Sequence, residues 1–145
     1  GESLGLPRPG AIDWTIDVPE DLVVDADPDQ VFRMLSNLVG NAVQVLESHP
    51  GPGDRISVRA RRRDDAVVME VADGGPGVPA AARANLFVPF QGSARAGGTG
   101  LGLAIVAELA RAHGGSVALL EQGPGTTFRI VLPARAGGRN GRTGD

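Results

Sequence analysis

Short segments that alternate apolar and polar residues constrain the fold of this chain more than any other feature. Three segments show this pattern. In 11–18, the alternate residues that face one way are Ile12, Trp14, Ile16 and Val18, and those between them are Asp13, Thr15 and Asp17. In 56–61, they are Ile56, Val58 and Ala60 against Ser57, Arg59 and Arg61, and in 67–71 they are Val67, Met69 and Val71 against Val68 and Glu70. Strands of this kind are half-buried and fit a sheet that helices cover on one side only. A doubly wound parallel sheet would be apolar throughout. We therefore expect an α/β two-layer sandwich.

The remaining segments predict helices and further strands. Asp27, Pro28 and Gln30 have the pattern of an N-cap, a first-turn proline and a capping box, so a helix is expected over 27–48, before the helix-breaking segment 49–53. The other predicted elements are a short helix around 79–87, a helix over about 100–112 that Gly114 and Gly115 end, and strands at 22–25, 117–120 and 126–132.

Length and composition fit a single globular domain, because 145 residues with 41% hydrophobic content can bury a sizeable core. The single tryptophan, Trp14, is expected either in that core or in a contact with another domain. Residues 136–145 have no large apolar side chain and are expected to be a disordered tail.

Charge and cysteine usage exclude several classes of function. The net charge of −3 leaves no basic excess for binding nucleic acid. The absence of cysteine excludes disulfides, zinc thiolates and a cysteine nucleophile, and no apolar run is long enough to span a membrane. All 14 basic residues are arginine. The Walker phosphate-binding loop and the protein kinase fold both place a lysine on the nucleotide phosphates, so this chain can build neither.

The segment 97–102 has glycine at four of its six positions and leads directly into the second long helix. Glycine lets a ligand approach the main chain closely, and a helix N-terminus attracts anions because its N–H groups are unpaired. This pattern favours a phosphate site. On this segment alone, a flexible linker before an ordinary helix explains the glycines as well.

Two further features place polar groups beside the expected core. Asn37 and Asn41 are four residues apart on the 27–48 helix, so both face the same way beside its apolar stripe. An amide oxygen is a suitable ligand for Mg²⁺. Alternatively, the two amides lie on a helix surface that faces water.

Asp73 shares the strand parity of Val71, which places its carboxylate at the end of the helix-covered face. A carboxylate there needs a hydrogen-bond donor, and the exocyclic amine of adenine would serve. Alternatively, Asp73 is an ordinary turn aspartate whose hydrogen bonds come from the turn itself.

Five short motifs, in chain order, resemble those of the ATP-binding domain shared by bacterial sensor histidine kinases, gyrase-type topoisomerases, Hsp90 chaperones and MutL-type repair proteins. The N box, first glycine box, F box, second glycine box and final threonine box of that domain resemble NLVGNA at 37–42, DGGPG at 73–77, LFVPF at 86–90, GTGLGL at 98–103 and GTTF at 125–128. The resemblance covers about residues 11–133. It implies the Bergerat-type ATP-binding fold, with a mixed, mostly antiparallel sheet and helices on one face.

The resemblance also implies ATP and Mg²⁺ as cofactors. Asn41 would bind the Mg²⁺ that bridges the phosphates, as a metal ligand and catalytic residue, and Asn37 would assist it. Asp73 would read adenine. Where the chain has Gln44 and Val45, the family often has lysine and tyrosine, so a phosphate cation and an aromatic wall are missing. The other implied cofactor-binding residues are Gln44, Gly75, Gly77, Phe87, Phe90, Gly98, Thr99, Gly100, Leu101, Gly102, Leu103 and Thr126.

Between the F box and the second glycine box, the segment 91–97 is short and rich in small residues, as expected of a closing lid. Phe87 and Phe90 would anchor it. Arg95 is the one cation in this segment and is the second candidate catalytic residue, for steadying the transferring phosphate. A solvent-exposed loop charge is an equally good explanation of Arg95.

Asn37 distinguishes between members of the resembled superfamily. The hydrolysing members carry a glutamate at this position as a base for water, whereas an amide cannot accept a proton at neutral pH. A neutral imidazole needs no such base, because it is already nucleophilic. We therefore interpret the chain as the catalytic domain of a two-component sensor histidine kinase, which transfers the ATP γ-phosphoryl group to a histidine. A weak ATPase or a degenerate nucleotide-binding scaffold is the alternative.

Neither histidine has the context of a phosphoryl acceptor, because His49 precedes Pro50 at a helix end and His113 precedes a helix-ending glycine pair. The acceptor is expected on a dimerisation helix of a longer parent protein, with 1–10 as a leader from that region and 11–135 as the catalytic domain. Expected partners are that acceptor domain and a response regulator receiver domain, with no nucleic acid and no direct membrane contact. The expected location is cytoplasmic, whether or not the parent is anchored in a membrane.

Overall fold

The computed structural model describes residues 12–20, 22–48, 54–88, 102–120 and 125–134. Its elements are, in chain order, β1 (Asp13–Asp17), α1 (Pro28–Ser48), β2 (Arg55–Arg63), β3 (Ala66–Asp73), α2 (Ala80–Arg83), α3 (Gly102–Ala112), β4 (Ser116–Leu120) and β5 (Thr126–Pro133). The predicted leader 1–10, the lid segment 91–97 and the tail 136–145 lie outside the described residues.

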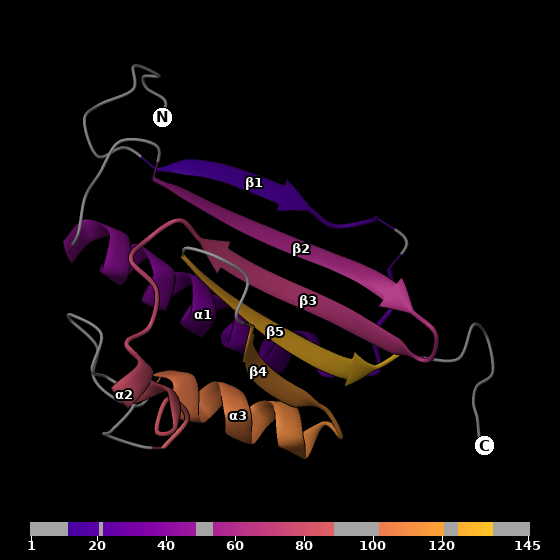
Figure 1. Cartoon of the computed structure of the whole chain (residues 1–145). Helices are drawn as coiled ribbons and strands as arrows, with labels where there is room; N and C mark the ends of the chain where they lie inside the picture. The colour runs from indigo at the N-terminus through magenta and orange to yellow at the C-terminus, as the bar shows by residue number, and fades with distance from the viewer. Residues whose placement is uncertain (1–11, 21, 49–53, 89–101, 121–124, 135–145) are drawn as a thin grey trace.

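The strands form one sheet in the order β1-β2-β3-β5-β4 (Figure 1). β1 pairs with β2 in parallel, and the other neighbours pair antiparallel. The helices α1 and α3 pack against each other, α1 on β2 and β3 and α3 on β4 and β5. The predicted two-layer α/β sandwich with a mixed, mostly antiparallel sheet is confirmed.

The predicted start of α1 is confirmed at its N-cap. Asp27 Oδ1 accepts a hydrogen bond of 2.8 Å from the backbone N–H of Asp29, and the Asp27 carbonyl accepts the N–H groups of Gln30 and Val31 at 3.0 Å. Gln30 Oε1 is buried and accepts no hydrogen bond from the described residues. Only the aspartate half of the predicted capping box therefore forms.

The end of α3 is a Schellman motif. The N–H of Gly114 donates to the Arg111 carbonyl at 3.0 Å, and the N–H of Gly115 donates to the Ala110 carbonyl at 2.8 Å. Gly114 has φ +78°, which a residue with a side chain adopts only at a cost. The predicted helix end at the glycine pair is therefore confirmed.

The predicted strand at 22–25 is wrong. The described residues 22–25 are not in a strand, and they belong to the connection from β1 to α1. Asp25 donates one backbone hydrogen bond of 3.0 Å to Pro133, while Leu22 and Val24 pack against the core. The apolar residues Leu22 and Val24 thus serve to pack this connection against the core, and not to pair in a ladder.

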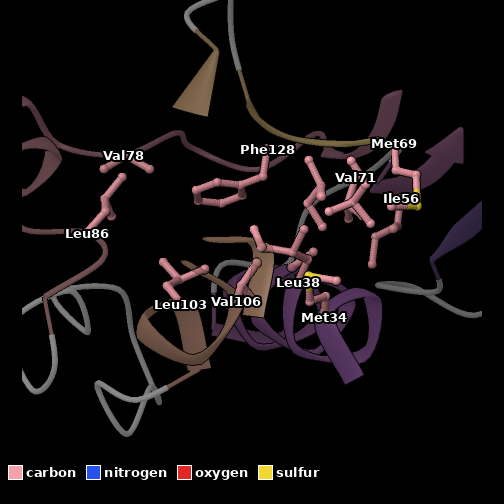
Figure 2. Close-up of a cluster of buried hydrophobic side chains, with 14 of the residues drawn as sticks. Met34, Leu38, Ile56, Met69, Val71, Val78, Leu86, Leu103, Val106 and Phe128 are labelled. Atoms are coloured by element: carbon pink, nitrogen blue, oxygen red, sulfur yellow. The ribbon is translucent and has the colours of Figure 1, made fainter. Parts of the chain in front are cut away.

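One hydrophobic core lies between the sheet and the helices. Figure 2 shows Phe128 of β5 pointing toward Val78, with Leu103 and Val106 of α3 nearby. Side chains that are fully buried in this layer each contribute about 1.5–3 kcal/mol. The largest of them are Met34, Leu38, Leu46, Ile56, Leu86, Ile130, Leu132, Val67 and Val106.

The strand β1 is present as predicted, but its apolar residues are not half-buried. Trp14 is 51% exposed and Ile16 is 66% exposed. Of the two places expected for Trp14, the core is therefore wrong, and a contact with another domain stays a prediction. Ile16 pairs with Val58 of β2, which pairs with Val71 of β3, and only Val71 of these three is fully buried. Two helices about 10 Å wide cover about four strands spaced 4.8 Å apart. The fifth strand extends beyond the helix layer.

Candidate functional site

Asp73 and Thr126 lie opposite each other at the junction of β3 and β5. They are cross-strand partners, and they are 8% and 3% exposed. Ile56 is the partner of Asp73 on β2 and is fully buried, so this row of residues points to the helix-covered face. The carboxylate position predicted from strand parity is therefore confirmed.

The Asp73 carboxylate is oriented by the turn that follows it. Its Oδ1 accepts a hydrogen bond of 2.9 Å from the backbone N–H of Gly75. A Cβ on Gly75 would lie 3.0 Å from Asp73 Oδ1, 3.1 Å from Val45 Cγ1 and 3.3 Å from Leu46 Cδ2. The turn is therefore packed closely between the carboxylate and α1, and a side chain at Gly75 would push them apart.

Two glycines with positive φ support the same corner. Gly77 has φ +85° and Gly125 has φ +88°. A Cβ on Gly125 would overlap the Asp73 carbonyl oxygen, and a Cβ on Gly77 would lie 3.2 Å from the Gly125 carbonyl oxygen. Sequence reasoning did not assign a site role to Gly125, although its place before the threonine of GTTF was a signal. Its importance depends on the β3–β5 pairing.

The helix α1 carries the two predicted amides on one side. Asn37 Nδ2 donates a hydrogen bond of 3.0 Å to the Arg33 carbonyl, one turn earlier in the same helix. Asn41 is half-buried, and its Nδ2 atom is buried without a hydrogen-bond partner among the described residues. Gln44 is exposed. An unpartnered buried amide is costly, so Asn41, like Gln30 nearer the start of α1, is a polar group in need of a partner.

The amides also lie near the N-terminus of α3. A Cβ on Gly102 would lie 3.4 Å from Asn37 Oδ1, which places the first residue of α3 beside α1. Val45, which contacts the Gly75 turn, is one helical turn after Asn41, or about 6 Å along the axis. The structure therefore brings Asn37, Asn41, Gly102 and the Asp73 turn together along one side of α1.

The described part of the F box packs on the core. The rings of Phe87 and Phe128 meet edge to face, with centroids 6.0 Å apart and planes at 77°. Leu103, from the second glycine box, is 6% exposed in the same cluster. Six predicted site residues lie outside the described residues, so their positions are not assigned: Phe90, Arg95, Gly98, Thr99, Gly100 and Leu101.

Histidine and metal-ligand positions restrict the chemistry. His113 Nδ1 lies 2.8 Å from the Leu109 carbonyl at the end of α3, whereas His49 is outside the described residues. Within the described ranges, no three His, Cys, Asp or Glu side chains cluster to hold a metal ion.

Comparisons with known proteins agree with the geometry. Residues 26–136 match the family described as histidine kinase-, DNA gyrase B- and HSP90-like ATPase. The chain is 36% identical to the probable sensor histidine kinase TcrY of Mycobacterium tuberculosis over 83% of this chain and 26% of TcrY. It is 38% identical to the sensor histidine kinase ZraS of Escherichia coli over 76% of this chain and 23% of ZraS. The chain therefore spans about a quarter of these relatives.

Solved structures give the same relationship. The nucleotide-free catalytic domain of the histidine kinase ThkA is 30% identical and has a TM-score of 0.74, over 85% of this chain and 79% of that one. Full-length ShkA in complex with AMPPNP is 35% identical and has a TM-score of 0.72, over 88% of this chain and 27% of that one.

Among the described helices, none is long and apolar enough to cross a membrane.

Proposed function

Because this chain belongs to the histidine kinase-, DNA gyrase B- and HSP90-like ATPase family, we propose that it is the ATP-binding catalytic domain of a sensor histidine kinase. In this proposal it transfers the γ-phosphoryl group of ATP to a histidine on a separate dimerisation and acceptor domain. A response regulator receiver domain then takes the phosphoryl group. ThkA has been solved in complex with the response regulator TrrA, which supports this kind of partner.

Asp73 is proposed to bind the adenine ring of ATP. Asp73 is 8% exposed, and the hydrogen bond from the Gly75 N–H holds its carboxylate on the helix-covered face, where the exocyclic amine of adenine could donate to it. Gly75 has no Cβ, so the turn can pack against α1 and hold the carboxylate at this corner. Thr126, across the strand pair, is proposed to hold the other side of the base.

Asn41 is proposed to hold Mg²⁺ against the phosphates. Its amide has an acceptor oxygen for the cation and a donor nitrogen for a phosphate oxygen, and that nitrogen is buried without a partner in the part of the chain that the structure describes. Mg²⁺ commonly takes one or two protein oxygens and fills its other positions with phosphates and water. When bound, the ion would neutralise charge that develops on the transferring phosphoryl group.

The observation that carries the choice of kinase over hydrolase is the amide at Asn37. Its Nδ2 is bonded to the Arg33 carbonyl, and its Oδ1 faces the start of α3. An amide in this place orients groups but cannot take a proton from water. An imidazole acceptor does not need that proton transfer, so the site suits transfer to histidine.

Calorimetry with AMPPNP tests the binding part of the proposal. We expect the whole chain to bind one AMPPNP molecule, and to bind it more tightly with Mg²⁺ than with EDTA. Absence of binding at millimolar nucleotide would refute the catalytic assignment and favour a degenerate scaffold. That second candidate is favoured by Gln44, which is exposed and uncharged where the resembled family often has a lysine.

A transfer assay separates kinase from ATPase. The chain is incubated with Mg²⁺, γ-labelled ATP and the purified acceptor domain of TcrY, and both acid-labile phosphohistidine and released phosphate are measured. We expect phosphohistidine to form only when the acceptor domain is added. Phosphate release at the same rate without the acceptor, and without any phosphohistidine when it is present, would identify a weak ATPase instead.

A further inference from the structure

The helix α1 has an exposed face opposite the one that it packs on the core. The buried side chains of α1 are Met34, Leu38, Ala42, Val45 and Leu46. At about 100° per residue, six other residues lie on the side of the helix away from these. All of the six are exposed except the half-buried Val43, and we call them the outer α1 face: Phe32, Arg33, Ser36, Gly40, Val43 and Glu47.

Apolar side chains lie exposed on this face. Phe32 is 72% exposed, more than any other large apolar side chain among the described residues. Val43, three turns further along the helix, is half-buried. Between them, a Cβ on Gly40 would meet nothing within 4 Å, so the backbone of α1 is open to a close approach. The outer α1 face can therefore receive another helix, with its axis at the short end of the usual 8–10 Å separation.

The two charged residues of the outer α1 face lie at equal distances from Gly40, on opposite sides of it. Arg33 is seven residues before Gly40 and Glu47 is seven residues after it, which is about 10 Å along the axis in each direction. Both side chains are exposed. Neither charged group has an ion pair among the described residues, and this includes Asp29, one turn before Arg33. Both charges are therefore available to a partner.

Equal spacing with opposite charge makes this face complementary to itself. When a second copy of α1 crosses the first antiparallel at Gly40, a two-fold axis brings Arg33 of each copy opposite Glu47 of the other. A parallel pair would instead place Arg33 against Arg33 and Glu47 against Glu47, which is unfavourable. The two charges of the face cancel, so it has no excess charge of either sign to attract nucleic acid or anionic lipid.

We propose that two copies of this chain associate through the outer α1 face, with their α1 helices antiparallel and crossing at Gly40. The interface is isologous: Phe32 and Val43 of both copies lose contact with water, and two Arg33–Glu47 pairs form between the copies. A single pair of helices covers a small area, so the association is weak and reversible. The proposal does not depend on nucleotide binding.

Exchange of charges tests the antiparallel arrangement, with sedimentation equilibrium at up to about 1 mM chain as the measurement. We expect the wild-type chain to self-associate. Arg33→Glu and Glu47→Arg should each self-associate at least about ten-fold more weakly, because like charges then face each other. An equimolar mixture of these two variants should associate about as tightly as the wild type, because opposite charges face each other again at both ends.

Arg61→Glu is the matched control for Arg33→Glu. It makes the same change in net charge at an exposed position on β2, outside the outer α1 face, and should leave self-association unchanged. Circular dichroism and urea denaturation on each variant show whether the fold is retained.

Cross-linking tests the crossing point. The chain has no cysteine, so a single introduced cysteine reports on one position. Gly40→Cys should form a disulfide-linked dimer at least about ten-fold faster than Ala118→Cys, at an exposed position on β4, because a disulfide needs two Cα atoms within about 7 Å of each other. Adding Arg33→Glu to Gly40→Cys should slow the reaction toward the rate of the control.

Several outcomes would overturn the proposal. A wild-type chain that is monomeric at about 1 mM would show that two copies do not associate through any surface. Equal weakening by Arg33→Glu and Arg61→Glu would place the contact elsewhere. Failure of Arg33→Glu and Glu47→Arg to associate with each other would exclude the antiparallel pairing, and equal cross-linking rates of the two cysteine variants would exclude a crossing at Gly40.

Discussion

Gly125 lies directly against the backbone carbonyl of Asp73, with φ +88° and no room for a Cβ. This contact joins the start of β5 to the end of β3 at the point where the Asp73 carboxylate turns toward α1. The position of the proposed adenine-binding group thus depends on a residue that has no functional group of its own.

Gly125→Ala should therefore lower both stability and nucleotide affinity. A side chain at φ +88° is strained and would also displace the Asp73 carbonyl, so we expect a loss of about 2 kcal/mol or more in the free energy of unfolding. Urea denaturation measures this change, and calorimetry with AMPPNP measures the affinity.

Gly40→Ala is the matched control for that substitution. Gly40 is exposed on α1, and a Cβ there would meet nothing within 4 Å. The same chemical change should stabilise the chain by about 0.5–1 kcal/mol, because alanine is the better helix former. If both variants were equally stable, the close contact between Gly125 and Asp73 would not matter energetically.

Asp73→Asn tests whether this carboxylate reads the adenine amine. The substitution keeps an oxygen that can accept the Gly75 N–H, so the fold should be retained. We expect ATP affinity to fall about ten-fold or more, since a buried charge-assisted hydrogen bond is lost. Inosine triphosphate has no exocyclic amine, so the wild-type chain should prefer ATP and the variant should not. An unchanged preference in the variant would remove Asp73 from adenine recognition.

Asn41→Ala tests the proposed Mg²⁺ site. The wild-type chain should bind AMPPNP more tightly with Mg²⁺ than with EDTA, and this gain should disappear in the variant because the amide ligand is gone. Phosphoryl transfer to an acceptor domain should also be abolished. Ser36→Ala, at an exposed position on the same helix, is the control and should change neither measurement. A full Mg²⁺ effect in Asn41→Ala would contradict the assignment.

The ion pair between Glu70 and Arg129 should stabilise the outer face of the sheet. Arg129 Nη2 lies 2.7 Å and Nε 2.8 Å from Glu70 Oε2. The side chain of Glu70 is 17% exposed and that of Arg129 is 29% exposed, so water screens the pair only in part. A double-mutant cycle with Glu70→Gln and Arg129→Met should give a coupling of about 0.5–1.5 kcal/mol that falls with added salt. The Glu108–Arg111 pair is 71% exposed on both sides and should give less than about 0.5 kcal/mol.

Features that depend on local periodicity and turn chemistry were predictable from the sequence. The alternation of Val67, Met69 and Val71 assigned Asp73 to the helix-covered face, and the structure confirms this. Helix spacing aligned Asn37 with Asn41, and the glycine pair at 114 and 115 ended α3. These features follow from backbone geometry over a few residues, which is encoded within the segment itself.

Features that depend on distant segments were decided by the tertiary structure. The alternation in 11–18 predicted a strand correctly, but only the width of the helix layer determined that Trp14 and Ile16 stay exposed. The β3–β5 pairing determined that Gly125 and Thr126 meet Asp73, although about fifty residues separate them in the chain. A strand pattern specifies which side chains share a face, whereas burial and close approach depend on which other elements pack there.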